Sequence, residues 1–319
     1  MDKLNELTDL YDIEWACRAA KVLEVASKIG MFTLLAQKRL SATQICQRLK
    51  TNPAMTEKLL IASAALGLVK KHGSQYQNSQ LAKTYLVQGQ PLHQGDMIAH
   101  ADFVWNFWGN LPETIFSGPK QHNMTEAEHE TFIRAMHNIA IAGRSQLFLD
   151  NVDLSGRRKL FDVGGGPGTY SILACRRYPE LKAVVFDLPE IISITKDIIA
   201  GENMQDRVTV LEGNWQTDSF GENNDVVLLS DVMHGPENQA EMKLKKAYDS
   251  MPAGGVVVIQ EFLLNNEKTG PVIPAIFNVM VGAYSEKELL SLLRTAGFHK
   301  PRITVKSKSL GSTWITAVK

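Results

Sequence analysis

The sequence predicts an α/β protein in which a mostly helical, winged-helix-like N-terminal domain precedes a doubly wound sheet of seven strands. From residue 159 onward, short apolar runs alternate with helical stretches, whereas the first 150 residues read as nearly all helix. A glycine-rich segment at 164–168 follows the first of those runs, where doubly wound sheets bind their ligands. We therefore expect two domains, 1–150 and 151–319.

Length and composition agree with a soluble two-domain protein. The 319 residues are 44% hydrophobic and 21% charged, which is ordinary for a globular chain. The 34 basic and 34 acidic residues give a formal net charge of zero, which argues against binding a polyanion over the whole surface. The three cysteines form no C-x-x-C pair, so neither a thiolate zinc site nor a disulfide framework is expected.

The sequence shows no sign of export or membrane insertion. No apolar run reaches the roughly 18 residues that a membrane span requires. The acidic N-terminus lacks the apolar core of a signal peptide. We expect a cytoplasmic protein with no membrane partner.

The N-terminal domain is built from helices and one small hairpin. Apolar spacing predicts a helix over Glu14–Leu35, and Ser41 with Gln44 forms a capping-box pattern that opens the next one. Pro53 suits the first turn of a further helix, which stops at Gly67. A hairpin over 68–77 follows. Helix, turn, helix and hairpin in this order indicate a winged helix.

The C-terminal domain alternates strands with helices. The expected strands are 160–163, 183–187, 208–212, 226–230 and 256–260. Helical stretches at 170–178, 190–200, 237–250 and 285–296 separate them or follow the last. The continuously apolar runs indicate parallel strands that are buried on both faces. No helix lies between the final runs, 302–308 and 312–318, so we expect an antiparallel hairpin at the sheet edge.

The glycine segment has the spacing of a nucleotide-binding loop. Gly164, Gly166 and Gly168 follow Asp162, and their missing Cβ atoms allow a ligand to approach the backbone. The dinucleotide fingerprint requires glycine where Thr169 stands, and no P-loop lysine is present. Asp187, at the end of the second strand, places a carboxylate where it can bind two ribose hydroxyls.

This D-x-G-x-G-x-G pattern resembles the signature of class I methyltransferases that use S-adenosylmethionine (SAM). Nearly the whole chain is similar to small-molecule O-methyltransferases related to the caffeate and acetylserotonin enzymes, including their bacterial relatives. The segments that carry the resemblance are 162–168, 186–189, 212–214, 229–234, 252–255, 296–298 and, in the N-terminal half, 43–49 and 59–69. It implies a Rossmann-like fold, SAM as cofactor with S-adenosylhomocysteine as product, and a homodimer. The expected acceptor is a hydroxyl of an aromatic or polyketide-like small molecule.

The resemblance also implies which residues hold SAM. The methionyl end maps to the glycine loop, and the ribose maps to the carboxylate at the end of the second strand. The adenine maps to the residue after that carboxylate and to the residues after the third strand. The implied residues are Asp162, Gly164, Gly166, Asp187, Leu188, Asn214, Trp215 and Ser230. Asn214 stands where the family usually has aspartate, but its side-chain carbonyl can still accept a bond from an amine.

The implied catalytic pair is His234, as general base, and Glu261, which orients it. Two features depart from the family pattern. Gly235 replaces the aspartate that usually follows the histidine, and 281–285 lacks a glutamate near Ala283. Ser285 and Glu288 form a plain capping box there. Both the phenolic acceptor and simple histidine base chemistry are therefore hypotheses.

The acceptor pocket is implied less specifically. Phe132 and Met136 fit the family's Phe-x-x-x-Met pattern, and Asn278 and Met280 are candidates for the opposite wall. The aromatic cluster at 102–108 fits a pocket or a core equally well.

Other functions remain open at this point. A ligand-sensing regulator would use the winged helix on DNA, but the second helix of that motif offers only Lys58 to base edges. A SAM-binding relative could instead methylate carbon or nitrogen, or perform other chemistry. Zinc chemistry is disfavoured because Ile133 stands where the metalloprotease motif requires histidine. We expect no metal and no nucleic-acid partner.

Overall fold

The structure, a computed structural model, describes residues 3–118, 124–235 and 238–319. The chain divides into two compact units, Lys3–Gly109 and Asn110–Lys319. The division lies before the boundary expected near residue 150. The reason is that the helices between these points pack onto the large sheet's own helices, as Ile133 does against Ile191 and Ile194.

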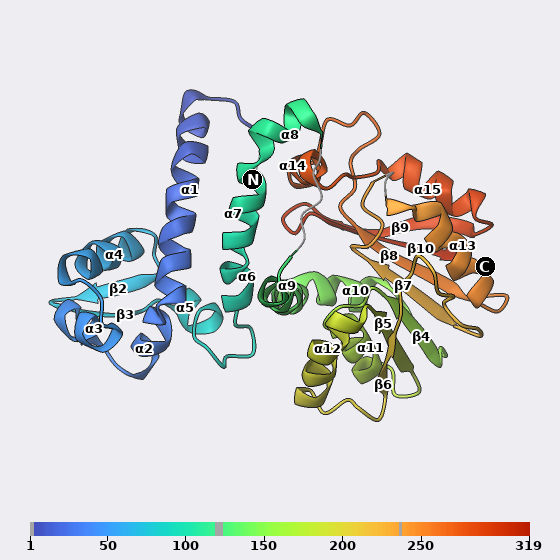
Figure 1. Cartoon of the computed structure of the whole chain (residues 1–319), viewed down its shortest axis with the longest axis horizontal. Coiled ribbons are helices and arrows are strands. Elements are labelled where there is room, and N and C mark those ends of the chain that lie inside the picture. Colours follow the sequence, from blue (N-terminus) through green and yellow to red (C-terminus); the bar gives the residue numbers. More distant parts are fainter. Residues whose placement is uncertain (1–2, 119–123, 236–237) are drawn as a thin grey trace. The chain divides into compact units, whose positions relative to one another are not determined.

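The first unit is a helical domain with a three-stranded sheet of order β1-β3-β2 (Figure 1). Its hairpin pairs Val69 with Asn78 and His72 with Gln75, which confirms the predicted wing. Its elements are α1 (Leu7–Lys28), α2 (Met31–Gln37), β1 (Leu40–Ser41), α3 (Ala42–Leu49), α4 (Pro53–Ala65), β2 (Val69–His72), β3 (Gln75–Asn78), α5 (Gln80–Tyr85), α6 (Gly95–Ala99) and α7 (Ala101–Gly109).

Local capping explains most of these boundaries. The Ser41 hydroxyl accepts from the Gln44 backbone while the Gln44 side chain accepts from the Ser41 backbone, which confirms the predicted capping box. Asn52 caps α4, and Pro53 occupies its first turn. The single helix predicted over Glu14–Leu35 is wrong, because Gly30 adopts a left-handed φ of 76° and separates α1 from α2.

The core of the first unit draws on α1 to α6 and the small sheet, and Phe32, Leu60 and Tyr76 are among its largest side chains. α7 carries the aromatic cluster at 102–108 and has no buried residue. The cluster is therefore not part of this unit's core.

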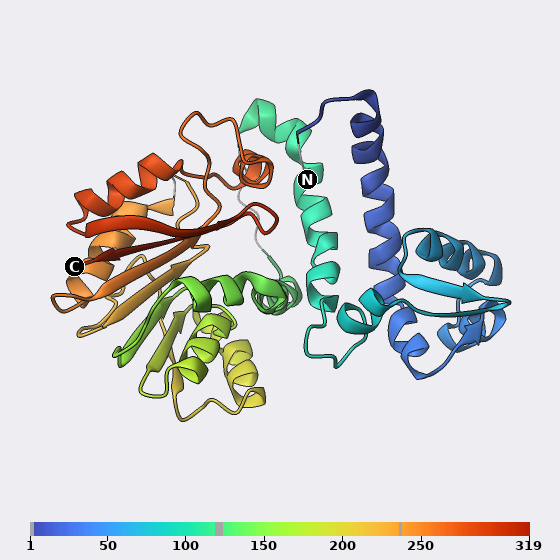
Figure 2. The same cartoon turned by 180° about the vertical axis from the view of Figure 1, so that it is seen from behind.

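The second unit contains a seven-stranded sheet of order β6-β5-β4-β7-β8-β10-β9. The first five strands in this order are parallel, and β10 pairs antiparallel with both β8 and β9, as predicted (Figure 2). The strands are β4 (Lys159–Val163), β5 (Lys182–Asp187), β6 (Val208–Glu212), β7 (Val226–Ser230), β8 (Val256–Glu261), β9 (His299–Ser307) and β10 (Ser312–Val318).

Helices cover the sheet on both faces, among them α10, α11, α13 and α15. The helices of the unit are α8 (Leu111–Ser117), α9 (Glu126–Ile139), the π-helical turn η1 (Ala140–Arg144), α10 (Ser145–Asn151), α11 (Thr169–Arg177), α12 (Pro189–Gly201), α13 (Ala240–Ser250), α14 (Val272–Met280) and α15 (Glu286–Thr295). The predicted start of α13 at Glu237 lies outside the described residues. The capping box of Ser285 and Glu288 is confirmed at α15. Within the described part of the chain, no helix has the length and apolar character of a membrane span.

Strand alternation divides the core of this unit into two layers. Val227 and Leu229 of β7 pack with α13 and α15 on one face, whereas Val226 and Leu228 pack with α10 and α11 on the other. Since both faces are covered, the central strands β4, β7 and β8 are mostly apolar along their length, as the sequence predicts. From β4 the chain adds β5 and β6 on one side, and after β6 it returns to place β7 on the other side of β4. The strand order therefore reverses between β4 and β7. Ligands bind at such a reversal.

Candidate functional site

The glycine loop lies at the carboxyl end of β4. Gly164, Gly166 and Gly168 have φ values of 61°, 50° and 68°, which side chains rarely adopt. A Cβ on Gly164 would lie 2.7 Å from Val232 Cγ1. The loop therefore packs directly against the segment that follows β7, and Gly168 begins α11.

Asp162 lies beneath this loop and is almost fully buried. Its Oδ2 accepts from the Ser171 hydroxyl at 2.7 Å, while Oδ1 is buried with no partner. Burial raises the pKa of Asp162 to about 7, and the nearby charge of Asp187 adds to the effect. A carboxylate in this situation is stabilised by a cationic donor, and the ammonium of a methionyl group is such a donor.

Asp187 ends β5 and faces the same loop. Its Oδ2 accepts from the Gly166 backbone and its Oδ1 from the Leu188 backbone, each at 2.8 Å. Burial raises its pKa, although these two bonds act in the opposite direction. Each oxygen keeps a lone pair, so the carboxylate can accept two further bonds, as a ribose diol requires.

The expected adenine residues have partners of their own. Asn214 Oδ1 accepts from the Gln216 backbone at 2.8 Å, so the oxygen assigned to an adenine amine also closes a turn. The Lys243 ammonium lies 3.7 Å from the centre of the Trp215 ring. Ser230 donates to Gln260 at 2.9 Å. The sequence did not identify Lys243, since a lysine inside a helical pattern is ordinarily solvated.

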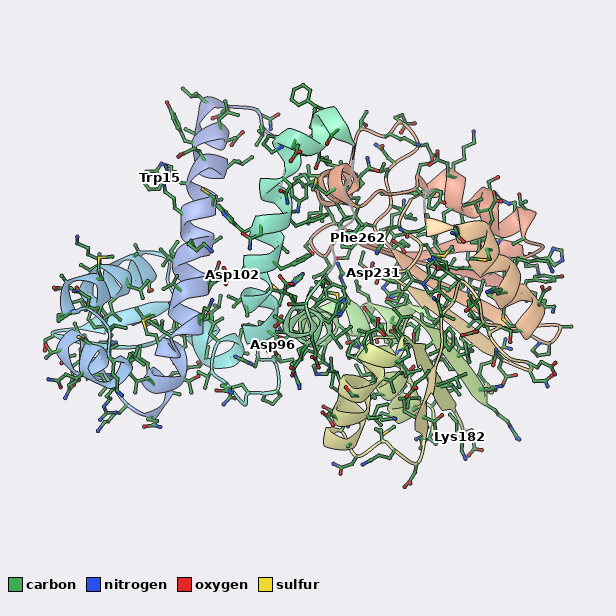
Figure 3. All side chains as sticks on the ribbon, in the orientation of Figure 1. Trp15, Asp96, Asp102, Lys182, Asp231 and Phe262 are labelled. Atoms are coloured by element: carbon green, nitrogen blue, oxygen red, sulfur yellow. The ribbon has the colours of Figure 1, made fainter. Side chains whose placement is uncertain are left out.

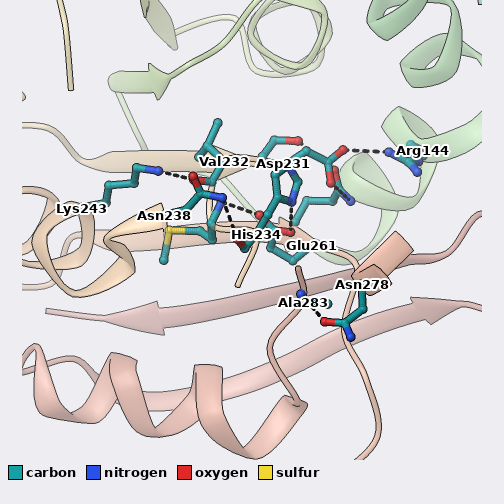
Figure 4. A network of polar contacts seen from close by, with 12 residues as sticks. Arg144, Asp231, Val232, His234, Asn238, Lys243, Glu261, Asn278 and Ala283 are labelled. Atoms are coloured by element: carbon teal, nitrogen blue, oxygen red, sulfur yellow. Dashed lines mark hydrogen bonds and ion pairs between the residues drawn. The ribbon is translucent and has the colours of Figure 1, made fainter. Parts of the chain in front are cut away.

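His234 and Glu261 meet beyond the ends of β7 and β8 (Figure 4). His234 Nδ1 lies 2.9 Å from Glu261 Oε2, and Glu261 Oε1 accepts from the Met233 backbone at 2.6 Å. The glutamate side chain is 2% exposed and the imidazole 19%. Burial opposes a charge on His234, but Glu261 and Asp231 outweigh it, so the pKa of His234 is raised.

The sequence did not identify an aromatic pair, Phe277 and Phe262, of which Phe277 lies against His234. Phe277 packs edge-on against the imidazole, with ring centres 5.1 Å apart, and stacks on Phe262 at 4.3 Å. Figure 3 labels Phe262 and Asp231, which both contact Arg144. Phe262 directly follows Glu261, but an aromatic residue after a strand is ordinarily read as core.

The residues expected to bind the acceptor belong to α9 and α14. Phe132, an acceptor candidate, and Leu188, an adenine candidate, both pack against the cluster of Ile133, Ile191 and Ile194. On α9 the sequence did not identify His137, whose Nδ1 lies 2.8 Å from the Thr169 hydroxyl at the start of α11. Asn278 has a structural partner, because its Oδ1 accepts from the Ala283 backbone at 2.8 Å.

Asp231, His234 and Glu261 also form a group in which one potential ligand atom from each lies within 4.8 Å of the others. Asp231 is paired with Arg144 at 2.8 Å, and His234 with Glu261. A neighbouring guanidinium disfavours a divalent cation. The expectation of no metal stays a prediction.

Comparison with known proteins agrees with this geometry. Residues 110–299 match the model of the O-methyltransferase domain and residues 15–88 that of the O-methyltransferase dimerisation domain. The chain is 32% identical to 3-hydroxy-5-methyl-1-naphthoate 3-O-methyltransferase of Streptomyces sahachiroi, over 98% of this chain and 94% of that protein. It is 24% identical to the N,N-dimethyltransferase OxyT of Streptomyces rimosus, over 97% and 96% of the two chains.

Among solved structures, human N-acetylserotonin methyltransferase in complex with SAM matches with a TM-score of 0.89 and 23% identity, covering 100% of this chain and 99% of that one. The fold is therefore that of a class I methyltransferase, and the predicted architecture is confirmed. The chain belongs to the O-methyltransferase family and uses SAM as its methyl donor. The partnerless oxygen of Asp162 and the lone pairs of Asp187 fit this cofactor.

The departure at Gly235 has a structural reason. Gly235 has a φ of 67°, and a Cβ there would lie 3.1 Å from Gly282 Cα and 3.2 Å from the Ala283 backbone nitrogen. The two backbone segments are therefore in contact, so the departures at Gly235 and near Ala283 belong to one arrangement. This backbone contact keeps the carbonyl group of His234 close to the loop that follows α14.

Gly235→Asp, which restores the residue usual in the family, is expected to lower stability by about 1–2 kcal/mol and to reduce kcat, because both the backbone and the contact with Gly282 oppose it. Gly221→Asp is the matched control, since Gly221 has a φ of 69° and nothing within 4 Å of a Cβ. Thermal unfolding and activity assays compare the two. Equal losses in both variants would contradict a role for the contact.

Proposed function

We propose that the protein transfers the methyl group of SAM to a hydroxyl of an aromatic small molecule, with His234 as general base. The observation that carries the proposal is the His234–Glu261 pair, 2.9 Å apart, in which His234 stands two residues after the Val232 that contacts the glycine loop. The naphthoate methyltransferase to which the chain is 32% identical acts on such a hydroxyl.

The residues have separate tasks in this reaction. When bound, SAM supplies an electrophilic methyl group on a sulfonium. Asp162 and the loop hold its methionyl end, and Asp187 holds the ribose. Leu188, Asn214, Trp215 and Ser230 complete the site.

His234 removes the acceptor's proton. Glu261 binds Nδ1, which fixes the tautomer and leaves Nε2 to take the hydroxyl proton. The raised pKa makes His234 a stronger base, and proton uptake is stabilised by the carboxylate behind it. Phe277, which Phe262 supports from behind by stacking, supplies an apolar ring beside His234 for an aromatic acceptor, and Phe132, Met136 and Met280 extend the proposed pocket.

A screen of acceptors tests this proposal. Wild-type enzyme with SAM is incubated with hydroxynaphthoates, catechols and anilines, and products are identified by mass spectrometry. We expect O-methylated naphthoates or phenols. Transfer to anilines alone would favour the alternative of nitrogen methylation, the activity named for the relative OxyT. SAM binding without transfer to any acceptor would favour chemistry other than methylation.

We also propose that the protein is a homodimer formed through α1 and the domain matched at 15–88, which begins within that helix. Support comes from α1, which exposes large apolar side chains along its first half. They are Leu7, Leu10, Tyr11, Ile13 and Trp15. A cytoplasmic location and the lack of a nucleic-acid partner stay predictions from the sequence.

Trp15→Glu is expected to convert the dimer into monomers, because Trp15 is 62% exposed and a carboxylate at the centre of an apolar interface is unfavourable. Light scattering after size-exclusion chromatography measures the mass. Leu211→Glu is the control, since Leu211 is an exposed apolar residue outside the matched domain. A dimeric Trp15→Glu protein would contradict this interface.

A further inference from the structure

Asp231 adopts an unusual backbone conformation at the start of the turn that carries His234. Its φ is 51°, in the left-handed region that residues other than glycine seldom enter. Three contacts hold it there. Its backbone donates to the Gln260 carbonyl at 2.9 Å, its Oδ1 accepts from the Gln260 amide at 3.0 Å, and its Oδ2 accepts from Arg144 at 2.8 Å. The side chain thus stabilises the turn that presents the imidazole.

Arg144 reaches Asp231 from a different part of the chain (Figure 4). It ends the π-helical turn η1, where Gly143 leaves helical geometry with a φ of 131°. Such turns are common at functional sites. The guanidinium also donates to the Leu310 carbonyl at 3.1 Å and lies 4.8 Å from the centre of the Phe262 ring. One buried side chain therefore connects η1, the turn after β7, the end of β8 and the β9–β10 turn.

The charges around His234 come from four elements. Glu261 belongs to β8, Asp231 to the turn after β7, Lys243 to α13, and Arg144 to η1 behind Asp231. When His234 is neutral, the negative charges of Glu261 and Asp231 balance the positive charges of Lys243 and Arg144. Without Asp231, the charge of Arg144 would be uncompensated and would oppose a proton on the imidazole.

We propose that Arg144 and Asp231 form a positioning unit for His234, in which the ion pair holds the turn and places a second carboxylate beside the imidazole. This rests on the proposed role of His234 as base. Arg144 and Asp231 touch neither the reacting atoms nor SAM in this assignment, and they act through His234.

Asp231→Asn tests the electrostatic part, because it keeps the size of the side chain and removes its charge. Removing a negative charge lowers the pKa of His234, so the acid limb of kcat/KM and the imidazole titration followed by NMR should both move down by about one pH unit. The His234 signal is assigned by its absence from His234→Asn.

Arg144→Lys tests the geometric part, because lysine keeps the charge but not the planar fork that serves Asp231 and Leu310 together. We expect kcat to fall about tenfold with the pH midpoint unchanged. Arg207→Lys is the control, since Arg207 also donates to several carbonyls within the same unit but away from His234. It should lower the melting temperature without changing kcat or the midpoint.

An unchanged His234 titration in Asp231→Asn would overturn the electrostatic part, even if the variant were less stable. A wild-type rate in Arg144→Lys would overturn the geometric part, and that variant keeps the proposal testable if Asp231→Asn does not fold. Failure of the base assignment is distinguishable, because then His234→Asn would retain the rate while the NMR titration still responds to Asp231.

Discussion

Replacing His234 by alanine is expected to lower kcat by about 10²- to 10⁴-fold, the contribution typical of general base catalysis. The acceptor hydroxyl would then lose its proton to water without the imidazole that Glu261 orients at 2.9 Å. Binding of S-adenosylhomocysteine should stay within a few-fold of wild type, because no residue assigned to the cofactor is changed. Methyl transfer and isothermal titration calorimetry measure the two effects.

His299→Ala is the control for this variant, since His299 is an exposed histidine of the same unit, in β9. Its kcat should equal that of wild type. If His234→Ala keeps more than about a tenth of the wild-type kcat, His234 is not the general base. The enzyme would then act only by positioning the acceptor.

Replacing Asp187 by alanine is expected to weaken binding of SAM and S-adenosylhomocysteine at least about 100-fold. The variant loses the proposed bonds to the ribose hydroxyls, and hydrogen bonds to a charged group contribute about 1.5–3 kcal/mol each. It also releases the Gly166 and Leu188 backbone groups that the carboxylate holds at 2.8 Å. Calorimetric titration measures the affinity directly.

Glu212→Gln provides a matched control, because Glu212 pairs with Asp187 in the parallel register and is an exposed acid at the end of the next strand. It should bind S-adenosylhomocysteine as wild type does. If both variants lost a comparable amount of affinity, the cause would be the overall negative charge at this sheet edge and not specific bonds made by Asp187.

The elements of the sheet were predictable because their causes are local. Continuous apolar runs marked each strand, and capping residues such as Ser41, Asn52 and Ser285 marked helix starts. The helix expected to run through Gly30 failed for a related reason. Glycine tolerates both helical and left-handed conformations, and the packing of Met31 and Phe32 decides between them.

The candidate site was predictable where residues lie at or just beyond the carboxyl ends of strands, because the parallel sheet brings those ends together. Asp162 and Asp187 lie in the last residues of β4 and β5, and His234 follows β7. Arg144, Phe262 and Phe277 were not identified, because nothing in the sequence indicates which helix or loop returns to the site. The contact between Gly235 and Gly282 was equally hidden, since it joins backbones from distant segments.

The most direct test of base-assisted methyl transfer is the pH dependence of kcat/KM for an identified acceptor, measured in wild-type enzyme and in His234→Ala. Because the pKa of His234 is raised, the wild-type rate should increase with pH through a midpoint above 6.5 and then level off. The variant should lack this step. A step of the same midpoint and size in both enzymes would contradict the role of His234.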